Sequence, residues 1–176
     1  MGQGNIIGYE INEKTCQISF YNEEMAEPET MEVDADNYQI PLVIGKLRDT
    51  WAYGKEAKRL ASLKEGFTVN RLLDKSLAGE KIEFREESYE AVWLLAKFIE
   101  LSLQSFPKIN GIVFSVPELT EELAQMLRGI AVRMNIDKRH ISFRITKRVF
   151  CNYLFYQPKE LWQYEAALFC CDRNED

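Results

Sequence analysis

Alternating hydrophobic and polar positions near the N-terminus predict a β-hairpin over residues 6–21. Its second half alternates from Cys16 to Tyr21, which is the period-two pattern of a half-buried strand. A turn over residues 12–15 joins the two halves. A shorter alternating segment at residues 30–33 predicts a third antiparallel strand, and residues 38–47 are expected to be extended.

Helical spacing and continuous apolar runs dominate the rest of the chain. A helix is expected after Gly54, and the next two helices are predicted to start at the N-caps Ser88 and Thr120 and to end near residues 105 and 134. The apolar run at residues 109–116 predicts a central strand covered on both faces. The remaining predicted elements are strands at 81–85, 141–145 and 166–171 and a helix at 147–156. Three antiparallel strands followed by alternating helices and strands predict one α/β domain over residues 1–176.

Charge argues against nucleic acid as a partner. The 176-residue chain has a net charge of −6, whereas phosphate neutralisation needs clustered lysine and arginine. Basic residues concentrate in one short stretch, which we interpret as the solvated face of a strand and a helix start: Lys138, Arg139, Arg144, Lys147 and Arg148.

Metal and membrane binding are not expected either. The four cysteines form no CxxC pair, and the single histidine, His140, cannot supply the usual set of metal ligands. A reducing, cytoplasmic setting fits this cysteine usage. No apolar run approaches the roughly 18 residues of a membrane span, so the sequence predicts no membrane partner.

Three short sequence segments resemble segments of a known protein family. Residues 8–14 (GYEINEK) are similar in position to the chaperones' Gly-Ile-Asp-Leu-Gly-Thr-Thr hairpin. Residues 41–44 (PLVI), followed by 53–59 (YGKEAKR), resemble their Pro-Ser-Val-Val and Val-Gly-x-x-Ala-Lys-Arg segment. Residues 112–117 (IVFSVP) resemble their Ile-Val-Ile-Thr-Val-Pro. The chain thus resembles the N-terminal lobe of the actin, sugar kinase and heat-shock chaperone ATPase superfamily. This implies a ribonuclease-H-like α/β fold, in which a five-stranded mixed sheet carries helices on both faces.

The resemblance also implies a nucleotide site, and it points to its residues. In the family a second lobe follows, and nucleotide binds between the two lobes. Glu10 stands where the family has a magnesium-organising aspartate, and Asp172 stands where a second phosphate loop begins. If the site functions with ATP and magnesium, Glu10 and Asp172 are the expected magnesium-side carboxylates and Lys14 a phosphate contact. Otherwise Glu10 is a polar residue at a strand end, and Asp172 starts a solvated acidic tail.

Departures from the family pattern favour a non-catalytic role. The turn at residues 12–15 has no glycine and carries Glu13, while a phosphate cradle is built from glycines whose N–H groups approach the oxygens. No acid lies between Lys138 and Lys159 to position water. We therefore expect a protein-interaction or scaffold module without cofactor, whose partner is another protein or a second lobe. The alternative is the nucleotide-binding half of an ATPase. A nuclease would need several clustered carboxylates on the strands.

Large aromatic residues near the C-terminus are the candidate interface residues. Such residues are enriched at interface hot spots, although at this spacing they also suit a buried helix face. They are Tyr153, Phe155, Tyr156, Trp162 and Tyr164.

Overall fold

The computed structural model describes residues 5–22, 24–35, 37–63 and 66–147, and its largest unit is a mixed sheet. Five strands follow the order β11-β10-β1-β2-β3, and the short β4 also pairs with β2. These strands are β1 (Asn5–Ile11), β2 (Thr15–Asn22), β3 (Glu27–Thr30), β4 (Ile40–Pro41), β10 (Ile109–Val116) and β11 (Ile141–Ile145). The fold is therefore α/β with a mixed sheet, as the sequence predicts.

Strand β1 lies at the centre of this sheet. It pairs in parallel with β10, where Tyr9 is opposite Phe114, and antiparallel with β2, where Tyr9 is opposite Ile18. Alternate side chains of β1, at Ile7, Tyr9 and Ile11, are completely buried. The predicted hairpin and the predicted central strand at 109–116 are both confirmed.

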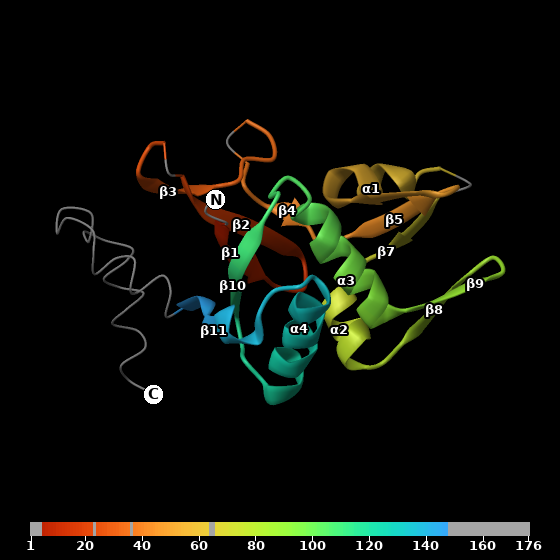
Figure 1. Ribbon diagram of the computed structural model, residues 1–176. Helices are drawn as coiled ribbons and strands as arrows, with labels where there is room; N and C mark the ends of the chain where they lie inside the picture. Colours follow the sequence, from red (N-terminus) through yellow and green to blue (C-terminus); the bar gives the residue numbers. More distant parts are fainter. Residues whose placement is uncertain (1–4, 23, 36, 64–65, 148–176) are drawn as a thin grey trace, which may run out of the picture.

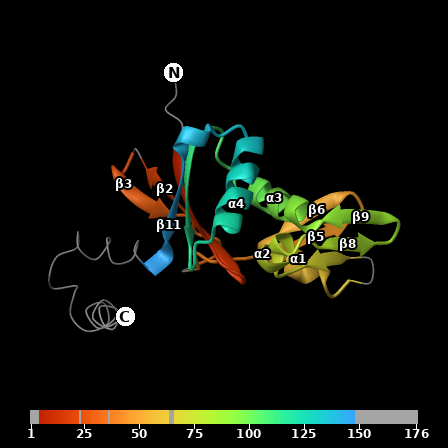
Figure 2. The same ribbon diagram turned by 90° about the horizontal axis from the view of Figure 1, so that it is seen from below.

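Two long helices cover one face of the central sheet. Helix α3 (Ala91–Ser102) precedes β10 and α4 (Glu121–Arg133) follows it, and both lie on the same side of the sheet (Figure 2). Helices on both faces were expected, and these two occupy a single face. A right-handed crossover between parallel strands places each connecting helix on a sheet face. Thr120 is the N-cap of α4, as predicted, because its hydroxyl accepts a hydrogen bond from Leu123 N at 3.2 Å.

A smaller unit is inserted between β4 and α3, beside one end of the central sheet (Figure 1). It contains a three-stranded sheet in the order β6-β5-β7 and a separate hairpin, β8–β9. Its elements are β5 (Ile44–Leu47), β6 (Thr50–Tyr53), α1 (Gly54–Leu60), β7 (Phe67–Val69), α2 (Leu72–Leu77), β8 (Lys81–Phe84) and β9 (Glu87–Glu90). The expectation of a single five-stranded sheet is corrected: the described residues form three sheets, and the central one has six strands.

One ion pair joins the hairpin to the small sheet. Lys46 Nζ on β5 lies 2.7 Å from Glu87 Oε2 on β9 and donates to the Tyr89 hydroxyl at 2.8 Å. The ammonium is also 5.5 Å from the ring centroid of Trp51, a cation–π distance. Trp93 of α3 extends the same aromatic cluster, which therefore connects the inserted unit to the long helix.

Two element boundaries differ from the sequence prediction. The third strand is Glu27–Thr30 rather than residues 30–33, because it pairs with Ser19–Asn22 of β2. Ser88 belongs to β9, and Glu90 is the N-cap of α3. The pairing of Tyr89 with Ile82 extends the hairpin almost to the start of this helix. The predicted helix at 147–156, apart from its first residue, and the strand at 166–171 lie outside the described residues. None of the described helices has the length and apolar character needed to cross a bilayer.

Candidate functional site

The carboxyl ends of the parallel strands define the candidate site, because open α/β sheets bind ligands at this edge. Glu10 near the end of β1 is opposite Ser115 of β10. Ser115 Oγ in turn donates to Thr146 Oγ1, just after β11, at 3.1 Å. The fold therefore brings Glu10 and two hydroxyl-bearing residues to neighbouring strand ends.

Glu10 provides one carboxylate at this edge. Its side chain is partly buried, and burial raises its pKa above the ordinary value, because a low-dielectric environment disfavours the charged form. Within the described ranges, no three His, Cys, Asp or Glu side chains are grouped to hold a metal ion. Asp172, the second expected carboxylate, lies outside these ranges. Glu10 thus belongs to no cluster of three metal-ligating side chains among the described residues.

The β1–β2 turn is closed by its own side chain. Asn12 Oδ1 accepts hydrogen bonds from Lys14 N at 2.9 Å and from Thr15 N at 3.0 Å. Asn12 N completes the turn by donating to Thr15 O at 3.0 Å. A phosphate cradle needs backbone N–H groups that are free to face the anion. In this turn two of those donors are already used.

Lys14 is the third expected site residue, and it lies at the tip of the turn. Its carbonyl accepts a hydrogen bond from Leu42 N at 2.8 Å, which fixes the turn against the strand region that follows β4. Its side chain is exposed, and its ammonium has no ion pair or hydrogen bond within the described residues. The structure places Lys14 in the same turn as Glu13, so an ammonium and a carboxyl group occupy adjacent positions.

Glu13 faces helix α2 across the site. One of its carboxylate oxygens, Oε2, is buried and accepts no hydrogen bond from the described chain. Burial, and then the neighbouring Asp74 carboxylate, raise the pKa of Glu13. Arg71 lowers the pKa of Asp74 through a contact of 2.6 Å, and the hydrogen bond with Glu13 lowers it further. Two carboxyl oxygens can hydrogen-bond to each other only if one carboxyl group is protonated. The raised pKa of Glu13 and the lowered pKa of Asp74 make Glu13 the group that binds its proton more tightly.

These contacts make the turn a poor phosphate site. A carboxyl pair lies beside it, two of its N–H groups are bonded to Asn12 Oδ1, and no cluster of three metal-ligating side chains is found among the described residues. The missing glycines and Glu13 were predicted from the sequence, whereas the role of Asn12 in closing the turn was not. Asparagine commonly hydrogen-bonds the backbone two residues ahead, and that signal was present in the turn sequence.

The free cysteine in the described region does not extend the site. Cys16 on β2 is almost fully buried, and burial raises the pKa of its thiol to about 12. A thiol of this kind packs as a small hydrophobic group. The aromatic candidates between Tyr153 and Tyr164 lie beyond the described residues.

Comparison with known proteins gives the family of the chain. Residues 27–175 match a family of unknown function (DUF5716), C-terminal. Because the match spans most of the sequence, the chain belongs to this family. No curated protein matches the chain.

Proposed function

We propose that this chain is a non-catalytic protein-interaction module built on an actin- and chaperone-like lobe. The carrying observation is the closed β1–β2 turn, where Asn12 Oδ1 takes the N–H groups of Lys14 and Thr15. Phosphoryl transfer depends on preorganised donors and metal ions around the phosphates. A turn that satisfies its own donors, next to the Glu13 carboxyl, removes that preorganisation.

The pairing within the central sheet supports the lobe as the scaffold. The three N-terminal strands are antiparallel neighbours, and β10 lies parallel to β1 with β11 beyond it. The resemblance implied this order, with helices α3 and α4 before and after β10. The inserted unit between β4 and α3 adds surface, and its helix α2 places Asp74 beside Glu13.

The alternative is the nucleotide-binding half of an ATPase that requires a second lobe. The position of Glu10 favours it, because this carboxylate lies at the end of β1 beside Ser115. Under this alternative, the second lobe supplies the missing donors and acids, and ATP with magnesium binds between the lobes. Under the module proposal, the partner is a protein, and the interaction with it takes place in the cytoplasm.

A thermal-shift experiment distinguishes the two functions for this chain. A ligand present at about 100 times its Kd stabilises the native state by about 2.7 kcal/mol. For a chain of this size, that stabilisation raises Tm by roughly 5 to 10 °C. The module proposal predicts no change in Tm with ATP and magnesium at about 1 mM, a concentration roughly 100 times a Kd of 10 μM. An increase of this size, lost when magnesium is omitted, supports the nucleotide-binding alternative.

A further inference from the structure

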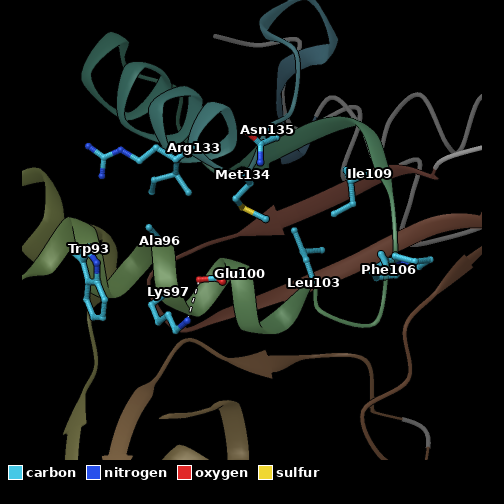
Figure 3. A pocket seen from close by; sticks show the side chains of 12 residues that line it. Trp93, Ala96, Lys97, Glu100, Leu103, Phe106, Ile109, Arg133, Met134 and Asn135 are labelled. Atoms are coloured by element: carbon cyan, nitrogen blue, oxygen red, sulfur yellow. Dashed lines mark hydrogen bonds and ion pairs between the residues drawn. The ribbon is translucent and has the colours of Figure 1, made fainter. Parts of the chain in front are cut away.

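A groove lies between helix α3 and the end of helix α4 (Figure 3). Its volume is about 590 Å³, within the range of pockets that enclose ligand groups. A second hollow of about 600 Å³ shares four of its residues, Pro107, Ile109, Met134 and Asn135. The two hollows therefore form one elongated groove that runs along α3 and around the start of β10.

The floor of this groove is apolar. Leu103 and Ile130 are each 2% exposed, and Ile109 and Met134 are partly buried. Figure 3 shows Leu103, Ile109 and Met134 directed into the space between the two helices. An apolar floor flanked by helices suits the apolar face of another helix, which presents side chains at i, i+3, i+4 and i+7.

Trp93 forms one wall of the groove and has the features of an interface anchor. Its side chain on α3 remains 41% exposed. Its ring centroid is 5.5 Å from that of Trp51 and 5.5 Å from that of Tyr89, so neighbouring rings hold the indole in place. Fixed, partly exposed tryptophans are frequent hot spots because little side-chain entropy is lost on binding.

The charge that remains at the groove is positive. The charges of Lys97 and Glu100 compensate each other, because Nζ lies 3.1 Å from Oε2 (Figure 3). Asp137 forms an ion pair with Arg139 at 2.7 Å. Arg133 on α4 and Lys108 before β10 are exposed, and neither side-chain cation has an ion pair or hydrogen bond within the described residues. Two uncompensated cations beside an apolar floor, in a chain with a net charge of −6, complement an acidic partner.

We infer that this groove binds an amphipathic acidic helix of a partner protein. Apolar side chains of that helix fill the floor over Leu103 and Met134, and one of them packs against Trp93. A carboxylate beside the apolar stripe pairs with Arg133. The inference rests on the proposed function as an interaction module, and it specifies the surface and the chemistry of the partner.

Fluorescence anisotropy with a designed helical peptide tests the inference. The probe is a fluorescein-labelled peptide of about 15 residues, long enough for a marginal helix, with leucines at i, i+3, i+4 and i+7 and flanking glutamates. Its matched counterpart has lysines in place of the glutamates. The full chain is expected to bind the glutamate peptide at least about tenfold more tightly than the lysine peptide, a difference of about 1.4 kcal/mol.

Two substitutions at the groove and two matched controls identify the surface. Trp93→Ala and Arg133→Glu are each expected to weaken binding of the glutamate peptide about tenfold. Arg133→Glu is also expected to strengthen binding of the lysine peptide, since the charge pair is restored with reversed signs. Tyr38→Ala removes an aromatic side chain that is also 41% exposed. Lys58→Glu reverses a cation in the last turn of α1, as Arg133 is a cation in the last turn of α4. Both controls should bind like the wild type.

Several results would overturn the inference. These are the absence of binding up to millimolar peptide, equal binding of the two peptides, and binding that Arg133→Glu leaves unchanged. Sedimentation that reveals a dimer, dissociated by Trp93→Ala and by Arg133→Glu, would assign the groove to a second copy instead. Thermal unfolding of each variant checks that loss of binding is not loss of folding.

The inference and the proposed function fail in different ways. Nucleotide binding together with an Arg133-dependent peptide complex would reject the non-catalytic function and leave the groove as assigned. Absence of both nucleotide and peptide binding would reject the groove while leaving the closed turn as the argument for an interaction module.

Discussion

Tyr9 and Ser102 form a buried hydrogen bond of 2.8 Å that joins the central strand β1 to helix α3. Ser102 Oγ also donates to Ile99 O at 2.9 Å, so this hydroxyl accepts from Tyr9. Tyr9 is completely buried, and burial raises the pKa of its hydroxyl well above the ordinary value. The bond therefore fixes α3, and with it one wall of the groove, to the sheet.

Removal of the serine hydroxyl should cost more than removal of the tyrosine hydroxyl. Ser102→Ala leaves the buried Tyr9 hydroxyl with the Cys16 thiol as a weak neighbouring acceptor, and we expect a loss of about 1 to 3 kcal/mol. Tyr9→Phe leaves Ser102 bonded to Ile99 O, with an expected loss of about 1 kcal/mol or less. Urea titration of both variants measures the difference. The opposite ranking would contradict the assigned direction of the bond.

Substitutions at two core residues should be strongly destabilising. Phe114 on β10 and Leu127 on α4 are completely buried, so Phe114→Ala and Leu127→Ala are each expected to cost about 2 to 5 kcal/mol. Leu77→Ala is the matched control, because Leu77 is 46% exposed. Denaturant titration gives all three free energies of unfolding. A loss below about 0.5 kcal/mol at either core residue would show that its side chain is not packed as described.

The carboxyl pair beside the turn should make stability depend on pH. Folding raises the pKa of Glu13 above its ordinary value of 4.5, so the folded state binds this proton more tightly than the unfolded chain. The contribution is fully present below pH 4.5 and is lost as pH rises through the folded pKa. Glu13→Gln keeps a donor toward Asp74 at every pH. It should stabilise the chain at pH 7, on the order of 0.5 kcal/mol for a partly solvated contact.

Unfolding measured as a function of pH tests this pair. The difference in unfolding free energy between Glu13→Gln and the wild type should grow from pH 4 to pH 7. Glu24→Gln, a substitution in the exposed loop after β2, should leave the curve parallel to that of the wild type. A constant difference for Glu13→Gln would mean that Glu13 and Asp74 do not share a proton.

Elements with strong local patterns were predictable from the sequence. Each of these elements shows its predictive pattern in its own residues. They are the hairpin of β1 and β2, the apolar strand β10, and helix α4 with its Thr120 cap. Ser88 shows the limit of such signals, because pairing of β9 with β8 overrides its capping preference. The small sheet was missed for a related reason. Its strands β5, β6 and β7 are only three to four residues long, too short for a clear period-two pattern.

The two candidate sites differed in how far the sequence could predict them. The absence of glycine at residues 12–15 indicated a defective phosphate turn, since the backbone conformation of a cradle depends on it. The Glu13 and Asp74 pair was not predictable, because the two residues are distant in the chain and meet only in the fold. The same is true of Trp93 and Arg133, which come from different helices and line one groove.

Titration calorimetry of ATP and magnesium into the full chain tests the central claim most directly. We predict binding no tighter than millimolar. The reasons are the closed turn at Asn12, the carboxyl group of Glu13 beside it, and the absence of a metal-ligating cluster among the described residues. A parallel phosphate-release assay should detect no hydrolysis. Micromolar binding that Glu10→Ala abolishes would contradict the account and establish Glu10 as a metal-side carboxylate. Micromolar binding that Glu10→Ala leaves unchanged would contradict it as well, and would place the nucleotide in a different pocket.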